Sequence, residues 1–345
     1  MGKHPDGGKD KDSELQRTVS FVDAPGHETL MAVMISGASI MDGALLLIAA
    51  NEQCPQPQTR EHLAALQIAG IENIVIVQNK VDLVSRERAI ESHKEISEFV
   101  SGTIAENAPI IPVSAHHDVN LDILIQAVEA KIPTPNRGDD EGMMHIARSF
   151  DINRPGTRPA GLKGGIIGGS IVRGKFSNGD DVVIAPGRRT TQGSKQTWIP
   201  IETRIMSMKG GGLELDEMNA GGLCGISTPL DPAMTKADNL SGQVMARKGE
   251  VPPIWEVMSL DLTLLERMVA SEEGKADKVK PLALNEMLMV NAATATSVGV
   301  VTKVSKGVTT LNLRLPICAT VGSRVTLSRR IDSRWRLIGH GTISG

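Results

Sequence analysis

The chain has 345 residues, 40% of them hydrophobic and 22% charged, so it can bury the cores of two or three domains. Its longest apolar run, Gly43–Ala50, is much shorter than the ~20 residues of a membrane-spanning helix, and residues 1–16 do not resemble a signal peptide. The three cysteines lie far apart and form neither a disulfide framework nor a zinc motif. The sequence therefore predicts a cytoplasmic protein with no membrane partner and no zinc site.

Charge is distributed unevenly along the chain. The net charge is −3, but residues 301–345 hold eight basic side chains against Asp332 alone, which leaves +7 there and about −10 in the first 300 residues. A basic C-terminal face around Arg329, Arg330, Arg334 and Arg336 indicates an anionic partner such as RNA, with a merely solvated face as the alternative. Aromatic residues make up only 2% of the chain, which argues against a module that stacks unpaired bases on aromatic rings.

The N-terminal third alternates between strand and helix patterns. Four βα units in a row imply a mostly parallel sheet with helices on both faces, in which ligands bind beyond the carboxyl ends of the strands. We expect Ala44–Ala50 to be buried on both faces, and Thr59 to cap the helix that ends near Gly70. The expected strands are Thr18–Val22, Ala44–Ala50, Asn73–Gln78 and Pro109–Val113, and the expected helices cover Thr29–Ser39, Thr59–Gly70, Ile90–Val100 and the residues after Asn120.

The helical period stops at the proline-bearing linker Pro133–Arg137, and short strands broken by turns follow. Gly164–Val172 and Val182–Ala185 predict a hairpin around the turn Asn178–Asp180. A second break lies at Val251–Pro253. After it the strand-like segments are Ser259–Leu265, Glu286–Ala292, Val298–Val304, Thr309–Arg314, Arg324–Ser328 and Trp335–Ile338. The predicted fold class is α/β plus all-β, a truncated doubly wound sheet followed by two β-barrels, with boundaries at 1–136, 137–252 and 253–345.

The first candidate site motif is Asp23-Ala24-Pro25-Gly26-His27, directly after the first expected strand. An aspartate at a strand end can hold the magnesium ion of a bound nucleotide through water. A glycine beside it lets a backbone N–H approach the terminal phosphate, and a following histidine can orient the attacking water. This motif predicts Asp23 and Gly26 as Mg²⁺ and phosphate residues and His27 as the catalytic residue.

Two further motifs follow the next expected strands. In Asn79-Lys80-Val81-Asp82 the carboxylate can accept two hydrogens from the guanine edge, the lysine stem can cover the base, and the asparagine can tie neighbouring loops together. In Ser114-Ala115 a backbone N–H can meet the guanine oxygen. Each motif alone is also compatible with an ordinary turn. Together, in this order and at successive strand ends, they predict a GTP-binding domain.

Longer stretches of the chain resemble the gamma subunit of archaeal and eukaryotic translation initiation factor 2. The resemblance extends over residues 15–344, and Cys54-Pro55-Gln56-Pro57-Gln58-Thr59 resembles this subunit more than the elongation factors that deliver aminoacyl-tRNA. It is carried by Asp23–Gln58, Ala105–Pro112, Arg148–Asp151, Gly164–Ser170, Ser328–Arg330 and Ser333–Gly339.

The resemblance implies a GTPase that binds GTP or GDP with Mg²⁺. It also implies binding of initiator methionyl-tRNA, delivery to the small ribosomal subunit, and a heterotrimer with alpha and beta subunits. The family's P-loop does not precede Asp23, and its switch I threonine and zinc-knuckle cysteines are absent from these residues. The match Gly169–Lys175 lies among barrel strands and lacks the strand-before, helix-after context of a P-loop. We therefore expect this polypeptide alone to bind GTP weakly and not to hydrolyse it measurably.

Two alternatives to this interpretation remain. In the first, the barrels bind tRNA or a partner subunit and the GTP-binding domain is vestigial, so the protein is a non-enzymatic scaffold. In the second, the chain is a selenocysteine- or elongation-type tRNA carrier, against which the residues around Cys54 argue.

Overall fold

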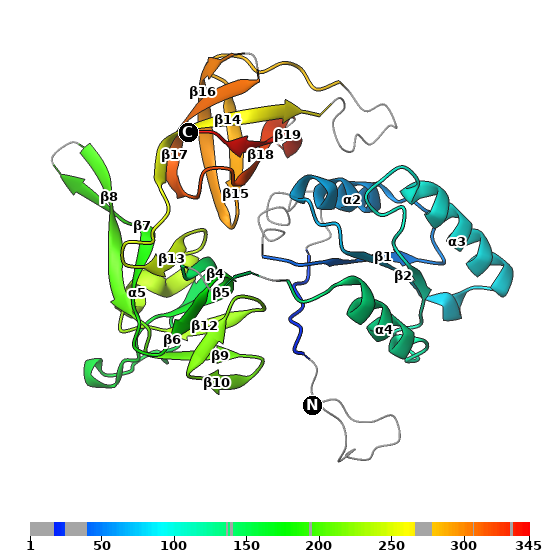
Figure 1. The fold of residues 1–345 in the computed structure, drawn as a ribbon, viewed down its shortest axis with the longest axis horizontal. Coiled ribbons are helices and arrows are strands. Elements are labelled where there is room, and N and C mark those ends of the chain that lie inside the picture. Colours follow the sequence, from blue (N-terminus) through cyan, green and yellow to red (C-terminus); the bar gives the residue numbers. More distant parts are fainter. Residues whose placement is uncertain are drawn as a thin grey trace.

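The computed structural model describes residues 17–24, 40–135, 137–138, 141–192, 195–265, 278–305, 307–331 and 334–345. An α/β part comes first, an antiparallel sheet follows it, and a closed barrel ends the chain (Figure 1). This order agrees with the predicted fold class.

The α/β part is a three-stranded parallel sheet in the order β1-β2-β3. Figure 1 shows α2 and α3 on one face of this sheet and α4 on the other. The main core lies on the α2 and α3 face, where Leu46, Leu63, Ile76 and Ile96 are buried together. The elements are β1 (Ala44–Ala49), α2 (Pro57–Ala69), β2 (Ile74–Asn79), the 3₁₀ turn η2 (Val81–Leu83), α3 (Arg86–Val100), β3 (Ile110–Pro112) and α4 (Leu121–Lys131).

The expected strand Thr18–Val22 is wrong. Residues 17–24 form no strand, and Phe21 is 72% exposed. Their contacts explain why: Arg17 donates to the carbonyl oxygen of Ile132 after α4, and the Ser20 hydroxyl accepts a hydrogen bond from the backbone N–H of Leu223. The segment is therefore held by a helix end and by the antiparallel sheet, and it does not pair with β1. The expected helix Thr29–Ser39 lies outside the described residues.

Two further local expectations in this part are wrong. The first is burial of β1 on both faces, because Leu47 is 60% exposed while Leu46 and Ile48 are buried. Successive side chains of a strand point to opposite faces, so β1 is uncovered on the face opposite α2 and α3, whereas Val75 and Val77 of β2 are buried on that face. The second is the cap at Thr59. Helix α2 begins earlier, with Gln56 at the N-cap and Pro57 in the first turn, where a proline's missing N–H costs nothing.

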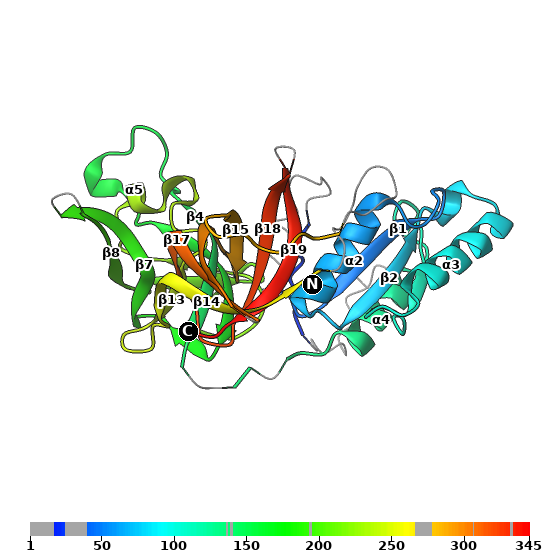
Figure 2. The same ribbon diagram turned by 90° about the horizontal axis from the view of Figure 1, so that it is seen from above.

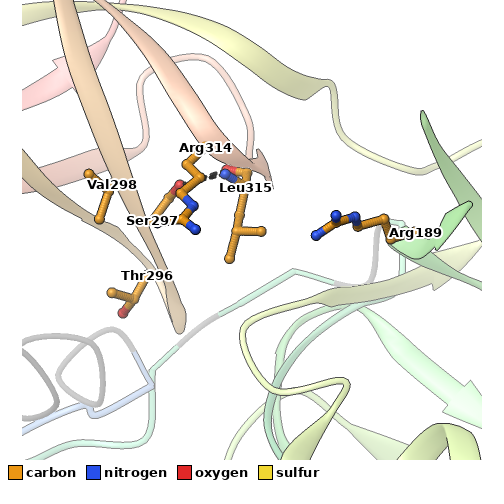
Figure 3. Close-up of a pocket in the computed structure, with 6 residues that line it drawn as sticks. All are labelled: Arg189, Thr296, Ser297, Val298, Arg314 and Leu315. Carbon is orange, nitrogen blue, oxygen red and sulfur yellow. Dashed lines mark hydrogen bonds between the residues drawn. The ribbon is translucent and has the colours of Figure 1, made fainter. Parts of the chain in front are cut away.

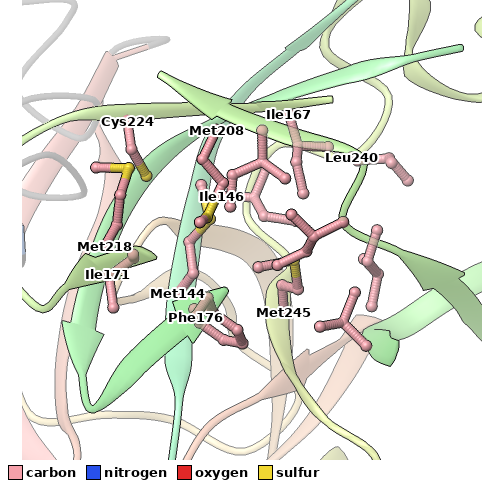
Figure 4. Close-up of a cluster of buried hydrophobic side chains, with 14 of the residues drawn as sticks. Met144, Ile146, Ile167, Ile171, Phe176, Met208, Met218, Cys224, Leu240 and Met245 are labelled. Carbon is pink, nitrogen blue, oxygen red and sulfur yellow. The ribbon is translucent and has the colours of Figure 1, made fainter. Parts of the chain in front are cut away.

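The antiparallel sheet has eight strands in the order β10-β9-β12-β5-β4-β13-β7-β8, and its ladder does not close among the described residues. Its core is rich in isoleucine and methionine, including Ile146, Ile167, Met208 and Met245 around Phe176 (Figure 4). The strands are β4 (Met143–Phe150), β5 (Ile166–Arg173), β7 (Asp181–Gln192), β8 (Lys195–Arg204), β9 (Ser207–Gly210), β10 (Leu213–Leu215), β12 (Cys224–Ser227) and β13 (Val244–Arg247). A separate pair, β6 (Lys175–Ser177) and β11 (Glu217–Asn219), and the short helices η3 (Pro159–Gly161), α5 (Pro232–Thr235) and η4 (Lys236–Asp238) complete this part.

The expected hairpin around Asn178–Asp180 is only half correct. The turn is present, with Gly179 at φ +90° and the Asp180 N–H bonded to the Ser177 carbonyl oxygen. The two expected strands do not pair with each other: Gly164–Val172 overlaps β5, which pairs with β4 and β12, and Val182–Ala185 lies in β7, which pairs with β8 and β13. The short strand β6 between them pairs with β11. The turn residues thus predicted where the chain reverses direction, whereas contacts between residues far apart in the sequence decided which strands pair.

The last part is a closed barrel in the order β14-β17-β16-β15-β18-β19. All six strand-like segments after Val251–Pro253 form its strands, and each overlaps its expected range. They alternate between buried and exposed residues, as barrel strands with one filled face do. The strands are β14 (Ile254–Leu264), β15 (Met287–Ala292), β16 (Ala295–Val304), β17 (Val308–Cys318), β18 (Arg324–Ile331) and β19 (Arg334–Ile343).

The barrel contacts both of the other parts. Figure 2 shows β18 and β19 between the α/β part and strands β7 and β8 of the antiparallel sheet. Towards α2, Leu337 is buried with Ala65 and Ile68. Towards the antiparallel sheet, Cys318 is buried with residues of β7 and β13. No described helix is long and apolar enough to cross a membrane.

Candidate functional site

The loop that follows β2 carries the first group of expected guanine-binding residues. Asn79 is the last residue of β2, and its side-chain Oδ1 accepts the N–H of Lys80 at 2.8 Å. The 3₁₀ turn Val81–Leu83 comes next, so Asp82 is held one short turn beyond the carboxyl end of a buried strand. The Val81 N–H donates to the Val113 carbonyl oxygen, which joins this loop to the chain after β3.

The loop that follows β3 lies directly beside it. The same Oδ1 atom of Asn79 accepts the N–H of Ala115 at 3.2 Å, so one side chain joins two loops that are 36 residues apart. Ser114 is buried and forms an isolated bridge with Val119, which closes the loop on itself. Parallel strands bring their carboxyl ends to one edge of the sheet, and here that edge unites the two expected guanine motifs.

Asp82 is the acceptor that this edge presents. A hydrogen bond from the Ser114 side chain lowers the pKa of Asp82 below its ordinary value of 3.8, and the nearby His117 and His116 lower it further. The carboxylate Oδ2 lies 3.8 Å from Nε2 of His117. Asp82 is therefore an anionic acceptor throughout the neutral range.

Lys80 adopts a backbone conformation that is unusual for a side-chain-bearing residue. Its φ is +64°, in the left-handed region. Non-glycine residues in this region are uncommon and cluster at active sites and ligand-binding sites. Its ammonium group lies 3.8 Å from the Glu52 carboxylate, in the loop after β1. The lysine stem thus bridges two loops at the edge of the sheet.

The loop after β1 is fixed by α3. The Cys54 N–H donates to the Glu95 carboxylate at 2.9 Å, and Arg88 joins the same carboxylate to the Glu52 carbonyl oxygen. Burial, together with the Glu95 charge, raises the pKa of the Cys54 thiol to about 11. Cys54 is therefore a structural residue, as expected, and not a nucleophile. Cys224 and Cys318 are buried as well.

Of the expected site residues in the first motif, only Asp23 is described, and it is exposed. Gly26 and His27 lie outside the described residues. The start of α4 is tied to the carboxyl edge by a bond from Asn120 Nδ2 to the Pro112 carbonyl oxygen, while Arg17 binds its far end. An 11-residue helix is about 16 Å long, so Arg17 lies at the opposite edge of the sheet.

The assembled loops carry the groups expected for a guanine site. Asp82 supplies a charged acceptor, and Lys80 lies two residues before it in the same loop. The Ala115 N–H already donates to Oδ1 of Asn79. If it also donates to a guanine oxygen, its one hydrogen is shared between the two acceptors. Among the described residues no group of three or more His, Cys, Asp or Glu could hold a metal ion.

Sequence reasoning missed three supporting residues. Glu52 pairs with Lys80, His117 faces Asp82, and Asn120 anchors the loop after β3. Two of them carried a signal: His117 and Asn120 lie three and six residues after Ser114, in a loop already singled out. Glu52 lies 28 residues before Lys80 in the sequence, and only the parallel pairing of β1 with β2 brings the two together.

The C-terminal arginines are mostly engaged within the chain. Arg329 binds the Glu286 carboxylate through two nitrogens, and Arg336 pairs with Glu61 of α2. Arg324 donates to the Ile68 carbonyl oxygen at the end of α2. These side chains hold the barrel together and join it to the α/β part, so the expected RNA contact around Arg329 and Arg336 loses two of its cations.

Two protein-family models match the chain. Residues 12–134 match the GTP-binding domain of elongation factor Tu, and residues 256–343 match the C-terminal part of initiation factor eIF2 gamma. Both matches agree with the position of the α/β part and of the barrel.

Curated relatives match nearly the whole chain. The translation initiation factor 2 subunit gamma of Methanocaldococcus jannaschii is 53% identical over 335 residues, which are 97% of this chain and 81% of that protein. The subunit of the same name from Haloquadratum walsbyi is 52% identical over 340 residues, 98% of this chain and 82% of that protein.

Solved structures share the fold at low identity. The translation elongation factor SelB of Methanococcus maripaludis, solved with the GTP analogue GppNHp, has a TM-score of 0.72 and 21% identity, covering 94% of this chain and 70% of that one. A bacterial selenocysteine-specific elongation factor has a TM-score of 0.71 and 20% identity, covering 92% of this chain and 47% of that one. At this identity the likeness concerns the arrangement of the strands and helices.

Proposed function

The chain belongs to the family of translation initiation factor 2 gamma subunits, and on that premise we propose that it binds a guanine nucleotide at the loops after β2 and β3. Asp82 accepts the two donor hydrogens of the guanine edge, Lys80 covers the base, and Asn79, Ser114 and Ala115 hold the two loops in place. The observation that carries this proposal is the pair of hydrogen bonds from Lys80 and Ala115 to one oxygen of Asn79.

The biological role follows from the family. The chain acts as the gamma subunit of initiation factor 2: with GTP it binds initiator methionyl-tRNA and carries it to the small ribosomal subunit, alongside alpha and beta subunits. Its place of action is the cytoplasm. Its three units are residues 1–136 for the nucleotide, 137–252 for the antiparallel sheet and 253–345 for the barrel. The proline-bearing segments before β4 and β14 support these boundaries.

The phosphate side of the site is assigned by motif. Asp23 holds Mg²⁺ through water, Gly26 offers its backbone N–H to the terminal phosphate, and His27 orients the attacking water for GTP hydrolysis. A bound Mg²⁺ ion neutralises charge on the phosphates. Asp23 is a suitable residue for this role because it is an exposed carboxylate without a hydrogen-bond or ion-pair partner among the residues described.

A base-specificity experiment tests the guanine site. Asparagine at position 82 replaces one acceptor oxygen with an NH₂ donor, which mismatches guanine but matches the C2 carbonyl of xanthine. We expect Asp82→Asn to lower the affinity for GDP by about tenfold and to raise the affinity for xanthosine diphosphate. Calorimetry on the 345-residue chain measures the dissociation constants for GDP and for xanthosine diphosphate. Their ratio reports the base preference, whatever the absolute affinity.

Asp118→Asn is the matched control. It removes the same charge from the neighbouring loop after β3, at an exposed residue with φ +54°, a conformation that asparagine tolerates. We expect its preference for guanine over xanthine to equal that of the unmodified chain. Equal changes in both variants, or no preference for guanine in the unmodified chain, would contradict the proposed site.

A second candidate function is a non-enzymatic scaffold that binds tRNA or partner subunits without a nucleotide. One observation favours it: residues 17–24 are tied to α4 and to the antiparallel sheet, away from the guanine loops. The two functions differ in whether GTP strengthens binding of initiator methionyl-tRNA. Binding of equal strength with and without GTP supports the scaffold.

A further inference from the structure

A pocket opens where the antiparallel sheet meets the barrel. It has a volume of about 360 Å³ and is lined by Arg189 of β7 and by residues of two barrel strands. That is the room of roughly a dozen water molecules at about 30 Å³ each. Figure 3 shows Arg189 reaching in from the antiparallel sheet and Arg314 and Leu315 on the barrel side. The barrel residues are Thr296, Ser297 and Val298 of β16 and Arg314 and Leu315 of β17.

The two walls of the pocket are joined by close packing. Ala185 of β7, Val244 of β13 and Cys318 of β17 form one buried apolar cluster. Gly242, at φ +82°, lies so close to the turn before Thr296 that an added Cβ would stand 3.1 Å from the Ala295 Cα. The positions of Arg189 and Arg314 are therefore set by packed backbone before any ligand arrives, which lowers the entropy cost of binding.

Arg189 and Arg314 are unpaired cations. Within the described part of the chain, neither guanidinium has a hydrogen bond or an ion pair. Elsewhere arginines at the contacts between parts are engaged: Arg324 binds a carbonyl oxygen of α2, and Arg137 pairs with Asp42. A cation without a partner on each wall of one pocket makes the pocket positive, and this favours an anionic ligand.

The lining selects the chemistry of that ligand. No acidic side chain lines the pocket, and the apolar side chains of Val298 and Leu315 lie beside the two cations. The Ser297 hydroxyl is occupied, since it donates to the Leu315 carbonyl oxygen and accepts its N–H. Thr296 Oγ1 accepts a bond from Asn291 and still has its own hydrogen to donate. Planar guanidinium groups bind phosphate oxygens in pairs, with a neighbouring hydroxyl as a further donor.

We propose that this pocket binds a backbone phosphate of a single-stranded RNA segment between Arg189 and Arg314. Of the eight basic side chains in residues 301–345, Arg329 and Arg336 are paired with carboxylates, whereas Arg314 lines this pocket and adds its charge to that of Arg189, so the pocket attracts a phosphate backbone. The lining contains no aromatic ring, so the pocket recognises the backbone and not the bases. The site goes beyond the proposed function, because it needs neither a nucleotide nor initiator tRNA.

The test measures binding of a fluorescent oligouridylate of roughly 12 nucleotides to the 345-residue chain by anisotropy over a range of KCl concentrations. We expect Arg189→Gln and Arg314→Gln each to weaken binding by about threefold to tenfold. The slope of log K against log [KCl] should fall by about 0.7 for each lost phosphate contact. Arg314→Lys should keep the slope and still lose affinity, because lysine carries the charge without the fork of donors.

Arg188→Gln is the matched control. It removes the same charge one residue earlier on β7, where the side chain points to the other face of the strand. We expect it to leave affinity and slope nearly unchanged. Equal losses in Arg188→Gln and Arg189→Gln would show only general attraction and would overturn the proposal, as would unchanged slopes in both pocket variants.

Competition distinguishes the sources of the phosphate. Inorganic phosphate or pyrophosphate that displaces the oligonucleotide at low millimolar concentration would indicate a small-anion site, and polyglutamate doing so would indicate an acidic protein. Either result overturns the RNA assignment. Circular dichroism and thermal midpoints of the variants confirm that they are folded. The guanine preference should be the same in Arg189→Gln and Arg314→Gln as in the unmodified chain, so failure of this proposal and failure of the guanine site are separable.

Discussion

The two halves of the expected nucleotide site differ in how they are held. The loops after β2 and β3 are joined to each other by Asn79 and by the bond between Val81 and Val113. Residues 17–24 have no strand partner, and their described anchors are Arg17 on the end of α4 and Ser20 on the antiparallel sheet. The loops after β2 and β3 are thus held by the parallel sheet that they belong to, and we call them the built half. Residues 17–24 are held only by contacts with neighbouring elements among the described residues, and we call them the attached half.

The difference shows what makes a strand-end motif dependable. Asn79 ends β2, a buried strand that is paired on both sides, and Ser114 follows β3, which pairs with β2 at the end of the ladder. The backbone of these paired strands fixes where each loop starts. The Thr18–Val22 segment has the right residue pattern but no pairing partner, so its apolar side chains stay exposed. Residue pattern alone therefore does not position a site residue; a paired strand does.

The largest expected effect comes from removing the shared acceptor of the built half. Asn79→Ala leaves the backbone N–H groups of Lys80 and Ala115 without their common partner. We expect the free energy of unfolding to fall by about 1–3 kcal/mol and the two loops to exchange amide hydrogens faster. Urea unfolding and hydrogen exchange measure both. Asn51→Ala, an exposed asparagine in the loop after β1, is the control, and an equal loss there would contradict the assigned role of Asn79.

A smaller effect is expected in the attached half. Arg17→Ala removes bonds to the Glu129 carboxylate and to the carbonyl oxygens of Val128 and Ile132. Because the ion pair is at the surface, the free energy of unfolding should fall by at most about 1 kcal/mol. Chymotrypsin cleavage after the exposed Phe21 should accelerate much more than global unfolding. Glu129→Gln keeps the carbonyl bonds and should show an intermediate rate, and an unchanged rate in Arg17→Ala would show that other contacts hold the segment.

The smallest effect concerns the pH dependence of the built half. The Ser114 hydrogen bond and the neighbouring histidines depress the pKa of Asp82 below 3.8 in the folded chain. The stabilisation is therefore fully present above the unfolded pKa and is lost as the pH falls through the lower, folded pKa. Carbon-13 titration of the carboxyl group between about pH 2 and 6 reports this value. Ser114→Ala should raise the pKa of Asp82 towards its ordinary value, and an unmoved titration would exclude Ser114 as the main cause.

Much of the fold could be predicted from local patterns. The six barrel strands were located because alternating apolar residues and turn residues repeat within each segment. Strands β2 and β3 were located because short apolar runs between helical patterns identify the buried strands of a parallel sheet. Their order then placed Asn79, Asp82 and Ser114 at one edge.

All but one of the wrong predictions share a cause: the feature that was predicted depends on residues far away in the sequence. The turn at Asn178–Asp180 is local, but the pairing of β6 with β11 joins residues about 40 apart. Exposure of Leu47 depends on what covers the far face of the sheet. The start of α2 at Pro57 is the exception, since Pro57 is itself a local start signal that competed with Thr59.

By itself the sequence determined the family and the order of the parts, and it predicted the residues proposed to read guanine, because motifs and periodicity are properties of neighbouring residues. Only the tertiary structure decided that Arg324, Arg329 and Arg336 are engaged within the chain, whereas Arg314 has no partner among the described residues. Whether a guanidinium meets a carbonyl oxygen of α2, as Arg324 does, or faces an open pocket, as Arg314 does, depends on the packing of strands far apart in the chain.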